Sequence, residues 1–348
     1  IKGLKRLEYR GYDSAGLSTM ENNQIFTSKC KGKITDLESL PSIEEHINSF
    51  GIGHTRWATH GEPNIDNAHP HNDSDNIFSL IHNGIIENHY SIKEYLMSKG
   101  IKFKSDTDTE VLVQFISYIY KKEKLDFYNT VKAVLKEVKG TYGIVVMCKD
   151  EPQKLVAAKN GSPLLIGIGK DENFLASDAS AILDETRNIF YLDDGEIAEV
   201  TKNTYKVTHI EHNQEIIKDI KEIEFSLDQI EKGNFKHFML KEIYEQPKAI
   251  EDAIRGRIDL DNNVKLGGIA DYVDRILESE NIFITACGTS WHAAQIGSYL
   301  LEDILKKPVK VEYASEFRYR NKSINEKSLL IAISQSGETA DTLAAVSK

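Results

Sequence analysis

The chain has 348 residues, 40% of them hydrophobic and 28% charged, which is enough for two soluble domains, each with its own core. The 54 Asp and Glu residues outnumber the 43 Lys and Arg residues, and a net charge of −11 argues against nucleic acid or an anionic membrane as the main partner. Cys30, Cys148 and Cys287 are far apart, which argues against a disulfide framework or zinc motif and favours a cytoplasmic protein.

The first part of the chain mixes short strands with a few helices. Apolar spacing predicts helices at 91–100, 108–124 and 127–140. Because strands and helices are clustered rather than alternating, we expect α+β layers rich in antiparallel sheet. Runs of β-branched and aromatic residues between turn residues predict strands at 51–57, 76–83, 142–149, 154–159, 164–169, 173–177, 188–192 and 196–201.

The pattern changes after a charged stretch, which we assign as a linker at 223–240. A helix is expected at 241–257, followed by strands that alternate with helices, as is typical of a parallel α/β sheet. We therefore expect a first domain at 1–222 and a second at 241–348. There is no initiator methionine or transmembrane run, and the last helix stops early, so we expect both ends to be cuts through a larger structure.

Two similar strand–loop–helix junctions lie in the second domain, "ACGTS" at 286–290 and "SQSGET" at 334–339. Helix N-termini that carry Ser and Thr offer hydrogen-bond donors to phosphate, and neighbouring parallel strands would bring both loops to one sheet edge. Simple helix capping explains either loop alone, but the pair favours a phosphate site. Neither loop fits a nucleotide-binding fingerprint, so a small phosphorylated metabolite is expected.

Three motifs of the first domain have both a structural and a functional interpretation. Thr107 and Glu110 have the spacing of a capping box, yet the nearby acids exceed what a cap needs, and one of them could meet a ligand ammonium. The pair Asn83–Gly84 is typical of a turn or, alternatively, of an oxyanion hole. His69 and His71 suggest zinc, but Pro70 separates them and no cysteine is near, so we expect no metal.

Taken together, the blocks "RGYDSAG", "HTRWATHGEPN", "NAHPH", "HNGIIENH", "DTDTE", "KEIYEQP", "ACGTS" and "SQSGETADT" closely resemble the glutamine–fructose-6-phosphate aminotransferase (isomerizing) family. The resemblance covers essentially the whole chain. It implies an Ntn-hydrolase-type glutaminase domain with αββα layers, followed by the start of an α/β parallel-sheet sugar isomerase (SIS) domain. It also implies that the full-length protein is a homodimer without a cofactor.

The activity implied by the resemblance is the conversion of glutamine and fructose 6-phosphate to glutamate and glucosamine 6-phosphate, the first step of hexosamine synthesis, with ammonia channelled between the domains. Asn83 and Gly84 would form the oxyanion hole, and Arg10 would orient the nucleophile. Arg56 and Asp108 would bind the carboxylate and ammonium of glutamine, and Trp57 would gate the ammonia passage. The sugar phosphate would be bound by Ser290, Ser334, Gln335, Ser336 and Thr339.

In the resembled family the nucleophile is a cysteine at the mature N-terminus, and the isomerising residues come from later sequence. Neither is found in these 348 residues, so we expect this polypeptide alone to be inactive. Two other classes remain as alternatives. One is a non-catalytic module that senses an amino acid and a sugar phosphate, and the other is a metal-dependent hydrolase that uses His69 and His71.

Overall fold

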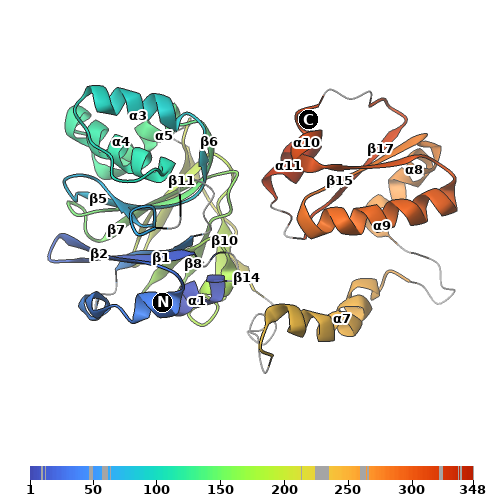
Figure 1. Ribbon diagram of the computed structural model, residues 1–348, viewed down its shortest axis with the longest axis horizontal. Helices are drawn as coiled ribbons and strands as arrows, with labels where there is room; N and C mark the ends of the chain where they lie inside the picture. Colours follow the sequence, from blue (N-terminus) through green and yellow to red (C-terminus); the bar gives the residue numbers. More distant parts are fainter. Residues whose placement is uncertain are drawn as a thin grey trace. The chain divides into compact units, whose positions relative to one another are not determined.

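The computed structural model divides into two compact units, residues 1–231 and 232–348 (Figure 1). A seven-stranded antiparallel sheet, in the order β13-β12-β11-β7-β6-β5-β4, runs through the first unit. The structure describes all residues except 9–10, 12, 47–49, 57–61, 63, 213, 224–234, 259–263, 265, 321–323, 336, 338 and 348.

The two faces of the seven-stranded sheet lie against different cores because side chains alternate along its strands. In β6, Ile144 and Val146 join the core beneath the helices, whereas Val145 and Met147 join the core on the opposite face. The strands of this sheet are β4 (His71–Asn72), β5 (Phe78–Ile86), β6 (Gly140–Cys148), β7 (Lys154–Asn160), β11 (Glu196–Thr201), β12 (Tyr205–His209) and β13 (Glu215–Ile216).

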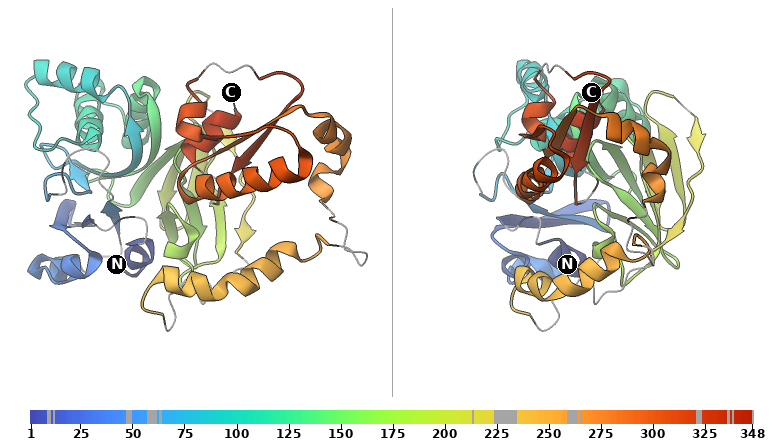
Figure 2. Two further views of the ribbon diagram at one scale, coloured as in Figure 1. Left: turned by 45° about the vertical axis from the view of Figure 1, so that its right-hand side comes forward. Right: turned by 90° about the vertical axis from the view of Figure 1, so that its right-hand side faces the viewer.

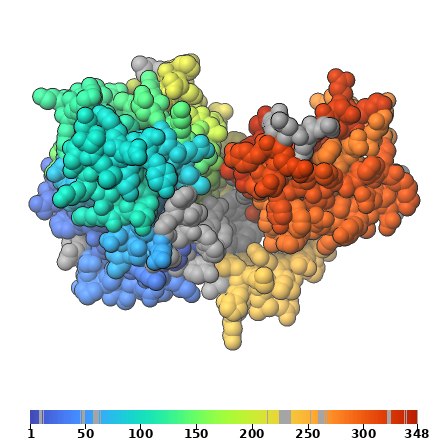
Figure 3. All heavy atoms as spheres, turned by 45° about the horizontal axis from the view of Figure 1, so that its top comes forward, coloured from blue at the N-terminus to red at the C-terminus, as the bar shows by residue number. Residues whose placement is uncertain are grey.

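Three helices, α3 (His89–Ser98), α4 (Asp108–Glu123) and α5 (Phe127–Glu137), cover one face of this sheet and form the cyan-to-green surface in Figure 3. α4 is the most buried of them, since every residue from Asp108 to Ser117 is buried. Asp108, the first residue of α4, accepts a hydrogen bond from the backbone N–H of Ile86 at the end of β5. This contact joins the two elements that carry the candidate site.

The other face of the large sheet packs against two smaller sheets, in the orders β2-β1-β3 and β14-β10-β8-β9. Helices α1 (Lys2–Leu7) and α2 (Ile34–Glu38) pack on the first of these, so the layers are α, β, β and α, as expected. The strands are β1 (Ser14–Glu21), β2 (Gln24–Lys31), β3 (Gly51–Arg56), β8 (Leu165–Ile168), β9 (Asn173–Ala176), β10 (Asn188–Tyr191) and β14 (Lys221–Glu222).

The second unit contains a three-stranded parallel sheet in the order β16-β15-β17, which confirms the predicted start of an α/β domain. Helix α9 packs along one face of this sheet (Figure 2), and α10 and α11 pack on the other. No helix in the described ranges is long and apolar enough to cross a membrane. The elements are α7 (Phe238–Ile254), α8 (Val273–Glu278), β15 (Asn281–Ala286), α9 (Gly288–Leu305), β16 (Val309–Tyr313), α10 (Ala314–Phe317), β17 (Ser328–Ile333) and α11 (Ala340–Val346).

Candidate active site

Asn83 and Gly84 lie inside β5, where they pair with Gly143 and Tyr142 of β6, so the Asn-Gly pair is not a turn. Gly84 has a φ of +130°, and a β-carbon there would come within 2.1 Å of the Thr141 carbonyl oxygen. Glycine is therefore required at this position. Asn83 and Gly84 are both exposed, and a side-chain amide beside an exposed, twisted backbone has the donor chemistry of an oxyanion hole.

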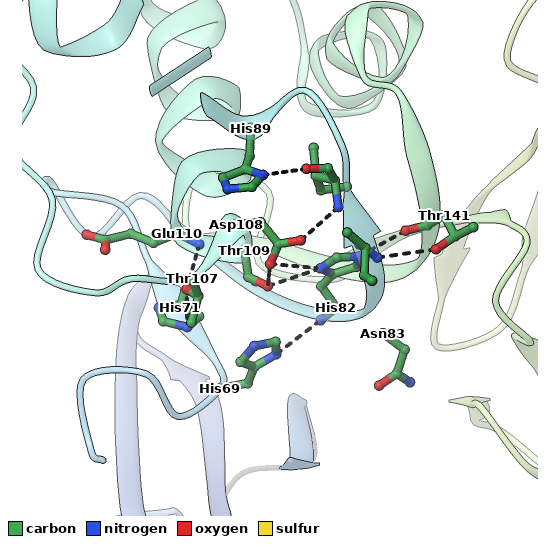
Figure 4. A network of polar contacts seen from close by, with 12 residues as sticks. His69, His71, His82, Asn83, His89, Thr107, Asp108, Thr109, Glu110 and Thr141 are labelled. Atoms are coloured by element: carbon green, nitrogen blue, oxygen red, sulfur yellow. Dashed lines mark hydrogen bonds and ion pairs between the residues drawn. The ribbon is translucent and has the colours of Figure 1, made fainter. Parts of the chain in front are cut away.

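Asp108 is the first residue of α4 and is buried against the end of β5. Its Oδ2 accepts a hydrogen bond of 2.8 Å from the backbone N–H of Ile86, two residues beyond Gly84. Its Oδ1 lies 3.9 Å from Nδ1 of His82, and Figure 4 shows these two side chains converging. The Asp108 carboxylate is thus held next to the candidate oxyanion hole.

Thr107 caps α4, because its hydroxyl accepts a hydrogen bond from the N–H of Glu110 at 3.2 Å. The second half of the predicted capping box is wrong. The Glu110 carboxylate accepts from the N–H groups of Lys104 and Ser105, whereas the N–H of Thr107 donates to Ser105 Oγ. Glu110 therefore binds the loop before α4, at Lys104 and Ser105, and does not complete the cap. These hydrogen bonds fix the backbone that leads into Asp108.

Arg56 ends β3 and is buried. Burial lowers the pKa of its guanidinium, while the carboxylates of Asp13 and Asp108 act in the opposite direction. The charge of Arg56 is therefore influenced by Asp13 first and by Asp108 second, so a cation and two anions lie within electrostatic range of one another. Arg10 and Trp57, to which the resemblance gave roles, lie outside the described residues.

Four buried histidines, His54, His69, His71 and His82, surround these groups. Burial lowers the pKa of all four side chains, that of His54 to about 4, so they are neutral near pH 7. In the parts of the chain that the structure describes, no three His, Cys, Asp or Glu side chains form a group that could hold a metal ion.

The buried histidines make hydrogen bonds to the elements that carry the site. Nδ1 of His82 lies 3.0 Å from the Thr109 hydroxyl and its Nε2 lies 3.3 Å from the Thr141 carbonyl oxygen, as Figure 4 shows. Nε2 of His54 lies 2.9 Å from Oδ1 of Asn83. The sequence drew attention to His69 and His71 only, as possible metal ligands, and no spacing in it indicates the long-range contacts of His54 and His82.

The two predicted phosphate loops lie at one edge of the second unit's sheet. β15 and β17 are adjacent and parallel, so the loops that follow them share the carboxyl edge. Ser290 lies half-buried in the first turn of α9, while Gln335 is exposed. Ser334 Oγ accepts from the N–H of Gly337 at 3.1 Å and lies 3.0 Å from the hydroxyl of Thr339, the N-cap of α11. Ser336 lies outside the described residues.

Comparison with known protein families identifies both units. The model of the glutamine amidotransferase domain matches residues 41–236, more than half of the chain. The chain belongs to this amidotransferase family. A second model, that of the SIS domain, matches residues 275–348 of the amidotransferase chain. Asn83 and Gly84 lie within the residues that the amidotransferase model matches.

Several curated relatives of this amidotransferase chain share one name. Proteins from Bacteroides thetaiotaomicron and Chlorobaculum tepidum, each named glutamine–fructose-6-phosphate aminotransferase [isomerizing], are 52% and 51% identical over 99% of the chain. The chain spans 57% of the length of each of these relatives. A solved glutamine phosphoribosylpyrophosphate amidotransferase from B. subtilis covers 89% of the chain, and 62% of that structure is matched, with a TM-score of 0.53. At 21% identity, this likeness shows the fold alone.

Proposed function

We propose that this chain carries the glutamine-hydrolysing part, and the beginning of the sugar-phosphate-binding part, of a glutamine–fructose-6-phosphate aminotransferase. The products would be glutamate and glucosamine 6-phosphate, formed in the cytoplasm. The observation that carries the proposal is the convergence of β3, α4 and β5: His54, two residues before Arg56, contacts Asn83, and Asp108 accepts a hydrogen bond from Ile86 at the end of β5. The names of relatives about 50% identical over 99% of the chain support the same conclusion.

In the proposed reaction a thiolate attacks the amide carbon of glutamine, and ammonia leaves as the tetrahedral intermediate collapses to a thioester. Water then releases glutamate and restores the thiol. The Asn83 amide and the Gly84 N–H would stabilise the oxyanion, a contribution of ~3–4 kcal/mol for one such donor. Arg56 and Asp108 would fix the carboxylate and ammonium of glutamine.

The nucleophile in this proposal is not Cys30 or Cys148. Burial raises the pKa of both thiols, that of Cys148 to about 12, so neither forms a thiolate near pH 7. Cys287 belongs to the second unit, directly before α9. The resemblance assigns the nucleophile to a cysteine at the mature N-terminus. The experiment that tests the proposal therefore uses the protein expressed from its complete coding sequence.

That experiment measures glutamate and glucosamine 6-phosphate in the presence of glutamine and fructose 6-phosphate, for the wild type and for Asp108→Asn. The asparagine keeps an oxygen that accepts from Ile86 N–H, so the fold is retained while the charge is lost. We expect the KM for glutamine to rise roughly 10- to 100-fold, the equivalent of one hydrogen bond to a charged group.

Asp106→Asn is the matched control, because Asp106 is two residues away and exposed. It should leave the KM for glutamine unchanged. A wild-type protein that forms glutamate but no amino sugar would restrict the proposal to the glutaminase step. A wild-type protein that forms neither product would overturn it and favour a module that only binds its ligands.

A further inference from the structure

One hydrogen bond decides which way the Asn83 amide points. Nε2 of His54, on β3, lies 2.9 Å from Oδ1 of Asn83, on β5, although the two residues are 29 positions apart in the chain. The amide oxygen can only accept hydrogen bonds, so Nε2 of His54 must be the donor. With Oδ1 turned toward His54, the amide nitrogen and its two hydrogens face the other way, from an exposed residue.

The tautomer of His54 follows from its surroundings. The buried Nδ1 of His54 has no hydrogen-bond partner at bonding distance among the residues that the structure describes, although the backbone of His82 lies near the ring and opposes the effect of burial on its pKa. A buried N–H without an acceptor is rarer in proteins than a buried acceptor without a donor, so the proton belongs on Nε2 rather than Nδ1. Burial lowers the pKa of His54 to about 4, and the ring stays neutral with a single N–H at neutral pH.

The plane of the His54 ring is held by its neighbour. His69 stacks on His54 with ring centroids 4.4 Å apart and an interplanar angle of 28°. His69 in turn meets His71 edge to face at 5.0 Å, and Nε2 of His71 lies 3.0 Å from the hydroxyl of Thr107, the N-cap of α4. These three buried rings therefore connect the Asn83 amide with the helix terminus that carries Asp108.

We infer that His54 is a positioning residue for glutamine hydrolysis: it fixes the Asn83 amide so that its Nδ2 hydrogens face the developing oxyanion. The inference rests on the proposed function, since it assumes that Asn83 contributes to an oxyanion hole. Without His54 the amide can rotate by half a turn. It would then present an oxygen, which repels the oxyanion instead of stabilising it.

Kinetics of glutamate release in the full-length protein test this role. His54→Leu removes the donor, and kcat should fall roughly tenfold, the kinetic equivalent of one neutral hydrogen bond, with the KM for glutamine unchanged. His54→Gln places an amide N–H near the position of Nε2 and should restore most of kcat. His212→Leu, at an exposed histidine, is the control and should match the wild type.

A double-mutant cycle separates orientation of the amide from a general structural effect. In the background of Asn83→Ala there is no amide to orient, so adding His54→Leu should not reduce kcat further. If His54→Leu slows the Asn83→Ala protein by the same factor as it slows the wild type, His54 acts elsewhere and the inference is wrong. A failure of His54→Gln to restore kcat would also contradict it.

Nitrogen NMR of the protein labelled at histidine tests the inference without any activity measurement. The expected signal for His54 is that of the neutral tautomer with the proton on Nε2. A proton on Nδ1 would mean that the Asn83 amide is reversed, and the inference would fail. If the wild type hydrolyses no glutamine, the proposed function fails, whereas an active wild type with an equally active His54→Leu variant overturns only the role of His54.

Discussion

Gly84 is the residue whose backbone conformation limits substitution most severely within the candidate site. In Gly84→Ala the new methyl group would meet backbone atoms, the Thr141 carbonyl oxygen at 2.1 Å and its carbon at 2.7 Å, which cannot swing aside as a side chain can. β5 must therefore shift and carry the Asn83 amide and the Gly84 N–H with it. We expect the kcat for glutamate release to fall by ~10²–10³, as for the loss of one oxyanion-hole donor.

Gly100→Ala is the matched control for this substitution. Gly100 also has a positive φ, +86°, but a β-carbon there would meet nothing within 4 Å. Its replacement should cost about 1 kcal/mol of stability for the backbone conformation alone, with kcat unchanged. Thermal unfolding and glutamate release of both variants are the measurements. A normal kcat in Gly84→Ala would show that the exact path of β5 is unimportant for the reaction.

At the scale of elements, helix α4 offers a comparison between two caps. Thr107 caps α4 and Asp126 caps α5, each through a side-chain oxygen that accepts a backbone hydrogen bond, but only α4 carries a residue of the site. Thr107→Ala and Asp126→Ala should each lower the free energy of unfolding by about 1 kcal/mol.

Only Thr107→Ala should also raise the KM for glutamine, because the first turn of α4 holds the Asp108 carboxylate and Thr107 contacts His71. Urea unfolding and glutaminase kinetics of the two variants are compared. Equal KM values in both variants would show that Asp108 is held by its bond to Ile86 alone and that the cap makes no separate contribution.

The elements with a clear apolar period were predicted well, and those that depend on tertiary contacts were not. Helices α4 and α5 follow the predicted spacing, but β1 and β2 were not among the predicted strands. In β1 buried residues follow one another in two runs of three, without the alternation that identifies a half-exposed strand. Asn83–Gly84 has a local preference for a turn, which pairing with β6 overrides.

At the scale of the whole molecule, the motifs indicated the candidate site residues one by one but not the contacts between them. Local signals such as the Thr107 cap and the strand–loop–helix junctions are contained in a few consecutive residues. The bond from His54 to Asn83 spans 29 positions and that from His82 to the Thr141 carbonyl spans 59. The first pairing forms only once the two sheets pack together and the second only once β5 pairs with β6, so a single sequence contains no periodic signal for either.

The buried histidines also make the stability of the first unit depend on pH. His54, His69, His71 and His82 have pKa values below the ordinary value of 6.5, that of His54 about 4, because burial penalises the charged form. In the unfolded chain they take up protons as the pH falls through about 6.5, whereas the folded chain does not. Their stabilising effect is therefore complete above pH 6.5 and is lost as the pH falls toward the folded-state values.

Calorimetric unfolding of the first unit at pH 7.5, 6.5 and 5.5 measures this effect, which should approach about 1.4 kcal/mol per pH unit for each such histidine below pH 6.5. His69→Phe keeps a ring beside His54 but removes one group that takes up a proton on unfolding. The free energy of unfolding of this variant should therefore decrease less steeply than that of the wild type as the pH is lowered. His212→Leu, at an exposed histidine, should leave the slope unchanged. Identical slopes for His69→Phe and the wild type would mean that His69 is already protonated in the folded protein, which its burial against His54 and His71 opposes.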